Sequence, residues 1–235
     1  MFIYYSHLLK IGFSVFLAFA GAVTLALVLG IAFHEFCHAL SAYALGDETA
    51  KRRGRLTLNP LAHLDPFGTI LLVVAGFGWG KPTPVNPYNM RIEPRAGMAI
   101  TAAAGPLSNL LVAAVLAIPI RAGWATWHDP FLTNFRISGW QFSDYFGLFL
   151  GAAIWINCIL AVFNFLPLAP LDGFRIWTGI LPLEVARPLM RLEPYGMFIL
   201  MALFLLGPAI GINIFGGIVQ PVGERITGTL TGVHY

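Results

Sequence analysis

Five consecutive residues, His34-Glu35-Phe36-Cys37-His38, form an HExxH pattern. On a helix, residues four positions apart differ by about 40° in rotation, so both imidazoles can reach one metal ion from the same face. The glutamate adjoins the first imidazole and is placed to take the proton of a metal-bound water. The pattern therefore predicts zinc ligation by the two histidines, with Glu35 as general base. The cysteine is read as a small buried apolar residue rather than a further ligand.

A third ligand is needed because a catalytic zinc takes three protein ligands and keeps one position for water. Of the eleven Asp and Glu, only Glu35 lies in the middle of an apolar run, and Asp172 lies just past the end of another. Pro167 and Pro170 prevent a regular helix there, and Gly173 permits a tight turn that points a carboxylate inwards. Alone, Asp172 would be a turn residue; beside HExxH it becomes the leading candidate ligand.

The composition places these residues in a membrane protein. Of 235 residues, 57% are hydrophobic and 11% are charged, whereas soluble domains carry about 25% charged residues. The net charge of +3 does not indicate nucleic acid, because no RNA- or DNA-binding motif accompanies the basic residues. We expect one membrane-embedded domain over residues 1–235, without internal repeats. The two cysteines imply no disulfide framework, and the sequence leaves the oligomeric state open.

Apolar runs predict an all-α polytopic fold with about four to five transmembrane segments and a re-entrant segment. A spanning helix needs about 20 residues. The candidate spans are residues 11–46, 96–120, 145–166 and 195–220, the last with a possible break near Gly207-Pro208.

Residues 68–80 (GTILLVVAGFGWG) form a Gly-rich run of thirteen residues, flanked by basic residues on both sides. The run is too short to span a bilayer, so we expect it to dip into the membrane and return to the same side. Together with KPTPVNP (residues 81–87), it could hold an extended substrate by strand addition.

The basic residues indicate the orientation. Alternating the predicted spans leaves four of the fourteen Lys and Arg on one side: Lys10, Arg121, Arg136 and Arg225. The remaining cations define the cytoplasmic side. Glu35 precedes Asp47 by twelve residues, about 18 Å along a helix, so the site should lie below the cytoplasmic surface and open towards it.

Four motifs give the chain a resemblance to the site-2 protease family of intramembrane zinc metallopeptidases. They occur in the family's order and cover roughly residues 30–180. They are HEFCH (34–38), LNPLAHLDPFG (58–68), AAGPLSN (103–109) and NFLPLAPLDG (164–173). KPTPVNP resembles a loop of the short prokaryotic branch, which lacks PDZ and CBS modules, and this sequence lacks them too.

The resemblance implies one Zn²⁺ per chain, bound by His34, His38 and Asp172, with Glu35 as general base. It also implies that Asn164 steadies the oxyanion or the substrate backbone. The expected substrate is a transmembrane protein in a lipid bilayer, cut within or near its membrane segment, with the enzyme in a prokaryotic cell membrane.

Two alternatives remain at this point: a membrane metal-binding or transport protein, and a catalytically silent scaffold. Transport does not require a glutamate beside the water position, and transporters usually show paired repeats. Of the secondary residues, His63 is expected in solvent. Gly105-Pro106 and Asn109 are expected to serve helix packing, Asn109 through a hydrogen bond to a neighbouring helix.

Overall fold

The computed structural model describes residues 6–10, 12–68, 70, 80–131 and 139–233. The longer helices are α2 (Phe13–Ala44), α5 (Pro94–Arg121), α6 (Phe142–Asn164), α7 (Asp172–Ile180), α8 (Leu183–Met190), α9 (Gly196–Leu205) and α10 (Gln220–Thr231). Short helical turns connect them: η1 (Ser6–Lys10), α3 (Thr49–Arg52), η2 (Pro60–Ala62), η3 (Pro87–Asn89), η4 (Glu193–Tyr195), η5 (Gly207–Ile210) and η6 (Phe215–Val219). Within these ranges the fold is helical apart from one isolated β-bridge, as predicted.

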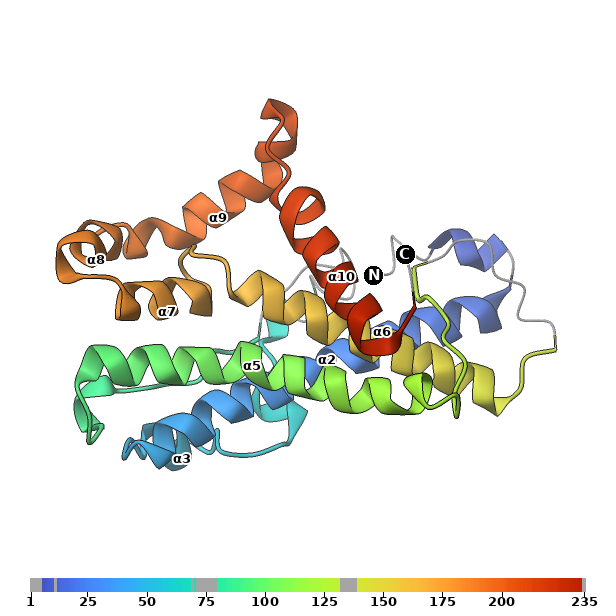
Figure 1. The fold of residues 1–235 in the computed structure, drawn as a ribbon, viewed down its shortest axis with the longest axis horizontal. Coiled ribbons are helices and arrows are strands. Elements are labelled where there is room, and N and C mark those ends of the chain that lie inside the picture. The colour runs from blue at the N-terminus through green and yellow to red at the C-terminus, as the bar shows by residue number, and fades with distance from the viewer. Residues whose placement is uncertain (1–5, 11, 69, 71–79, 132–138, 234–235) are drawn as a thin grey trace.

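Helices α2, α5 and α6 pack against one another and form the centre of the molecule (Figure 1). Helix α6 is the most enclosed of the long apolar helices, with 72% of its most apolar stretch buried inside the protein. One apolar cluster joins α2 to α6 through Phe19, Val23 and Leu148. A second joins α5 to α6 through Ala113, Ile154 and Cys158. The small residues at these contacts allow close helix approach, as in membrane interiors.

Among the described residues, four segments are long and apolar enough to cross a membrane: Phe13–Ala44, Pro94–Arg121, Phe142–Asn164 and Leu183–Leu205. This agrees with the predicted four to five spans and makes the chain an integral membrane protein. The first span is a single helix of 32 residues, about 48 Å long, so it can cross only tilted or with an end projecting. In Figure 1 the C-terminal end of α2, the start of α5 and helices α7 and α8 lie at one end of the molecule. The loops predicted to share a side therefore do so.

Most of the predicted re-entrant segment, residues 69 and 71–79, lies outside the described residues. Its two ends are described. Leu64 pairs with Gly80 in an antiparallel bridge, and the Lys81 main-chain N–H donates to the His63 carbonyl at 2.7 Å. Because a segment that crossed a hydrocarbon core about 30 Å thick would separate these ends, their pairing places residues 64 and 80 on one side, as the re-entrant prediction requires.

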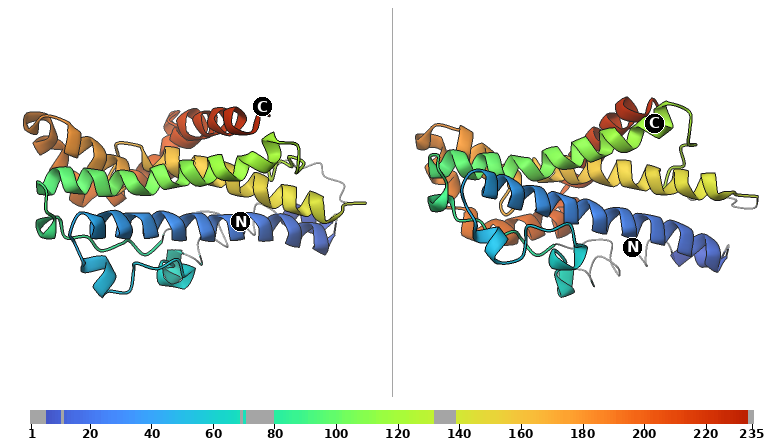
Figure 2. Two further views of the ribbon diagram at one scale, coloured as in Figure 1. Left: turned by 60° about the horizontal axis from the view of Figure 1, so that its bottom comes forward. Right: turned by 90° about the horizontal axis from the view of Figure 1, so that it is seen from below.

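The last apolar stretch breaks where the sequence indicated. Helix α9 ends at Leu205, and η5 begins at Gly207. The chain then turns back through η6 into α10, which lies against α5 and α6 (Figure 2). The prediction ended the apolar stretch at residue 220 and did not include α10, because QPVGERITGTLT is too polar for a span.

Candidate metal centre and active site

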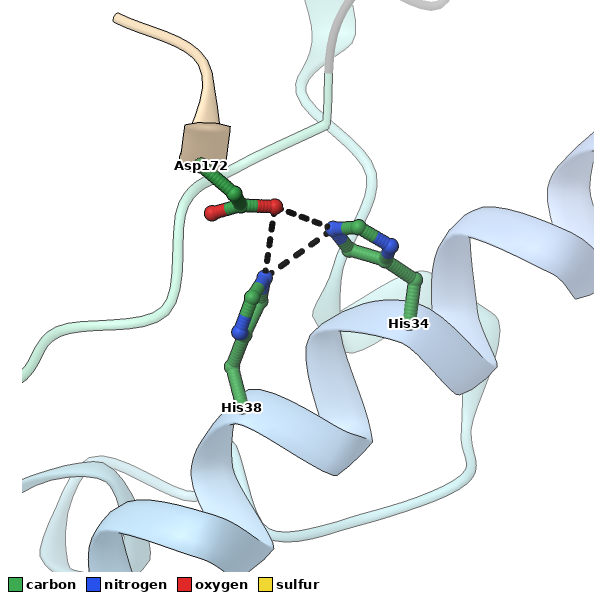
Figure 3. A group of neighbouring side chains, drawn as sticks. All are labelled: His34, His38 and Asp172. Carbon is green, nitrogen blue, oxygen red and sulfur yellow. Dashed lines mark hydrogen bonds and ion pairs between the residues drawn. The ribbon is translucent and has the colours of Figure 1, made fainter. Parts of the chain in front are cut away.

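Figure 3 shows His34 and His38 projecting from one face of α2 towards Asp172 at the start of α7. The two Nε2 atoms are 3.0 Å apart. Oδ2 of Asp172 lies 3.0 Å from Nε2 of His34 and 3.1 Å from Nε2 of His38. Both histidines are buried, and the aspartate is largely enclosed. The fold thus brings together three potential metal ligands from positions up to 138 residues apart.

This donor set fits a zinc ion. Zinc binds imidazole nitrogen and carboxylate oxygen at about 2.0–2.2 Å with tetrahedral geometry, which places neighbouring ligand atoms about 3.3 Å apart. The observed triangle is tighter by only a few tenths of an ångström. Burial opposes ionisation of Asp172, but the adjacent His38 and His34 outweigh it and hold the pKa of this carboxyl well below its usual range.

Asp172 is positioned by the break between α6 and α7. Helix α6 ends at Asn164 and α7 begins at Asp172, so the prolines between them do interrupt the helix as predicted. Gly173 lies in the first turn of α7 and does not have a positive φ. It is needed for space, because a Cβ there would lie 2.2 Å from the Leu166 carbonyl oxygen. The first turn of α7 can therefore press against the backbone that leaves α6.

Both histidines are oriented by hydrogen bonds from their second ring nitrogen. His34 Nδ1 lies 2.6 Å from Oδ1 of Asn109. The Asn109 amide donates to the Gly30 carbonyl and to Oδ1 of Asn157, so its oxygen must face His34 and accept. His38 Nδ1 donates to the Thr101 carbonyl at 2.7 Å. In the neutral tautomers that donate from Nδ1, each Nε2 presents a lone pair to the metal position, the arrangement typical of metal-binding histidines.

Helix α5 faces the two histidines with Gly105, a residue without a side chain. A Cβ on Gly105 would lie 2.4 Å from Nε2 of His38 and 2.6 Å from Cε1 of His34. Such contacts are far below van der Waals distance, so no larger residue fits without moving the ligands. Gly105 was predicted to serve helix packing, and the structure places that packing directly on the candidate ligands.

Glu35 is fixed by a residue that sequence reasoning did not single out. The Thr83 main-chain N–H donates to Oε2 of Glu35 at 2.9 Å, and the Thr83 hydroxyl donates to the Glu35 carbonyl at 3.1 Å.

A second residue that the sequence analysis did not single out is Asn157, whose amide donates to the Ala153 carbonyl in its own helix. An amide within an apolar span is a recognisable signal, because polar groups there need partners.

Three further residues that the sequence analysis named are Asn164, His63 and Asn109, and the structure shows the contacts of each. Asn164 donates from Nδ2 to the Leu160 carbonyl one turn earlier in α6, and no contact with the three ligands is among its described interactions. His63 is fully buried, so the expectation that it faces solvent is wrong. Its Nε2 lies 2.8 Å from the Thr57 carbonyl, which holds the loop before the re-entrant segment. Asn109 does bond to neighbouring helices, as predicted.

Comparison with known proteins identifies the family. The profile of Peptidase family M50 matches residues 135–207, which include Asp172. Over 187 residues the chain is 41% identical to the "Putative zinc metalloprotease YwhC" of Bacillus subtilis (strain 168), covering 77% of this chain and 79% of the relative. The chain belongs to peptidase family M50. It is a membrane metallopeptidase, and the predicted kinship with site-2 proteases is confirmed.

More distant relatives agree with this assignment. The "Putative zinc metalloprotease Rip2" of Mycolicibacterium smegmatis (strain ATCC 700084 / mc(2)155) is 29% identical over 186 residues, covering 78% of this chain and 66% of the relative. The Rip2 protein of Mycobacterium tuberculosis (strain ATCC 25618 / H37Rv) is 27% identical over 208 residues, covering 85% and 73%. No solved structure matches the chain.

Proposed function

We propose that this M50 peptidase is an intramembrane zinc protease that hydrolyses peptide bonds within or near transmembrane segments of membrane-protein substrates. The observation that carries the proposal is the convergence of His34, His38 and Asp172 within 3.1 Å of one another. The names of the relatives, which specify zinc metalloproteases, support zinc as the bound metal.

In the proposed reaction, one zinc ion per chain would polarise the scissile carbonyl and lower the pKa of a bound water to about 7. His34, His38 and Asp172 would hold the ion. Glu35 would accept the proton of the attacking water and deliver it to the leaving amine. Asn164 would donate to the oxyanion or the substrate backbone, for which its amide must turn away from the Leu160 carbonyl.

The substrate helix must unwind locally before attack, because its carbonyls are otherwise held in hydrogen bonds. We place the basic loops on the cytoplasmic side of a prokaryotic cell membrane, with the active site opening towards them. A metal carrier or a silent scaffold would use the same three ligands. Neither would require a carboxylate beside the first histidine. The effect of substituting Glu35 therefore distinguishes a protease from both alternatives.

The test uses three preparations reconstituted with a single-span substrate: wild type, Glu35→Gln and Asp172→Ala. Wild type should carry about one zinc per chain and lose cleavage on chelation. Glu35→Gln should retain zinc and lose about 10²- to 10⁴-fold in rate, because it lacks the positioned base. Asp172→Ala should lose most of its zinc. Undiminished cleavage by Glu35→Gln would refute the base assignment, and full zinc in Asp172→Ala would remove Asp172 from the ligand set.

A further inference from the structure

The segment that follows the re-entrant region is hydrogen-bonded to α2 and to the turn just after α2. At its start, Thr83 donates its main-chain N–H to Oε2 of Glu35. Three residues later, the Asn86 N–H donates to Oδ2 of Asp47 at 2.7 Å. Asp47 is fully buried just after the end of α2 and also accepts from the Asn89 amide at 3.0 Å. Thr83 is therefore held against Glu35, and the chain that follows it is anchored again at Asn86.

The prolines around Thr83 make its N–H the one main-chain donor of residues 82–84. Pro82 and Pro84 have no N–H, and a residue that precedes proline is biased towards extended backbone. Extended polyproline-like chain forms no internal hydrogen bonds. The Pro82-Thr83-Pro84 sequence thus presents a single main-chain donor, and in the structure that donor is bonded to Glu35.

The same bond bears on the expectation that residues 81–87 hold substrate by strand addition. An added strand needs free main-chain donors and acceptors along the receiving edge. The two prolines supply no donor, and the Thr83 N–H is already bonded to Glu35. This short stretch is therefore better suited to holding the enzyme's own carboxylate than to pairing with a substrate.

We propose that Thr83 is a positioning residue for catalysis: its main-chain N–H fixes the Glu35 carboxylate through Oε2, so that Oε1 faces the attacking water. The proposal rests on the proposed role of Glu35 as general base. A glutamate side chain has several rotamers, and a free carboxylate would spend most of its time out of reach of the water. Misplacement of a catalytic group by about 1 Å can cost about 10² in rate, which sets the scale of the expected effect.

The first test compares Thr83→Pro, which removes the N–H, with Thr83→Ala, which keeps it and removes only the hydroxyl. Zinc content, kcat and KM are measured on the reconstituted single-span substrate. Thr83→Pro should lower kcat by about 10- to 10²-fold with KM and zinc unchanged, whereas Thr83→Ala, which keeps the N–H, should lower kcat by much less than Thr83→Pro does. A wild-type kcat in zinc-loaded Thr83→Pro would overturn the proposal. A raised KM with unchanged kcat would also overturn it, because it would assign Thr83 to substrate binding.

A second measurement does not require the proline variant to fold. Main-chain amide hydrogen exchange is followed in ¹⁵N-labelled wild type and Glu35→Ala. The Thr83 amide should be protected in wild type and lose that protection in Glu35→Ala, while the Asn86 amide, bonded to Asp47, keeps its protection in both. Equal exchange of the Thr83 amide in the two proteins would refute the bond. Cleavage by Glu35→Gln is measured on the same substrate. This separates a failure of the proposed function from a failure of the proposal for Thr83.

Discussion

At the residue scale, the candidate site divides into contacts that follow from local spacing and contacts that do not. His34 and His38 share a helix face because four residues make about one turn, so their pairing was predictable. Asp172 could be proposed because two prolines and a glycine surround it. The Asn109 contact with His34 joins residues 75 positions apart, and the Thr83 contact uses a main-chain N–H. Neither leaves a pattern in one sequence that specifies its partner.

Gly105 gives the sharpest prediction at this scale. In Gly105→Ala the new methyl group would occupy the space of His38 Nε2 and His34 Cε1, so the histidines must rotate away from the metal position. We expect zinc affinity to fall by at least about 10-fold, the lower range seen when the orientation of ligands is disturbed. Isothermal titration with zinc checks this.

The matched control for that substitution is Gly21→Ala in α2, where a Cβ meets nothing within 4 Å. Alanine has a higher helix propensity than glycine, so this variant should be as stable as wild type or slightly more so, with unchanged zinc affinity. If Gly105→Ala binds zinc as tightly as the control does, the close approach of α5 to the ligands is not as described.

At the element scale, α5 organises the site although it supplies none of the three ligands. Its Thr101 carbonyl orients His38, and its Asn109 side chain orients His34. At its start, Arg95 donates from Nε to the Thr178 carbonyl at 2.6 Å, and its guanidinium also donates to the Leu181 carbonyl. These carbonyls lie at the C-terminal end of α7, the helix that begins with Asp172. The sequence predicted α5 as a span, but it gave no reason to connect its first turn to Thr178, 83 residues away.

Removing that connection should loosen α7. In Arg95→Ala the terminal carbonyls of α7 lose a charged donor, and a hydrogen bond to a charged group contributes about 1.5–3 kcal/mol. We expect a lower unfolding temperature and a several-fold weaker affinity for zinc, because Asp172 moves with α7. Thermal unfolding and zinc titration of the detergent-solubilised protein provide the measurements. Arg53→Ala, at an exposed position, is the control, and indistinguishable behaviour of the two variants would contradict the role given to Arg95.

At the scale of the whole molecule, the approximate number of apolar spans was predictable, because the length of a span must match the thickness of the bilayer. The return of α10 onto α5 and α6 was not, because its polar sequence carries no membrane signal and its packing depends on small contacts such as Gly223 against Ile159. Helix α9 behaves in the opposite way. Only 11% of the most apolar stretch of Leu183–Leu205 is buried inside the protein, so we expect this segment to contact lipid, as its apolar sequence indicates.

The arrangement of the spans predicts which surfaces a membrane-impermeant thiol reagent reaches. Single cysteines replace Arg53, Tyr88, Arg187 or Trp124 in a background with Cys37→Ala and Cys158→Ala that still cleaves substrate. Positions 53, 88 and 187 should react from the same side, because the loops and helices that carry them lie at one end of the bundle (Figure 1). Trp124 follows the opposite end of α5 and is 78% exposed, so position 124 should react from the other side. Labelling of positions 53 and 88 from opposite sides would mean that residues 68–80 cross the membrane, and the pairing of Leu64 with Gly80 would then have to be wrong.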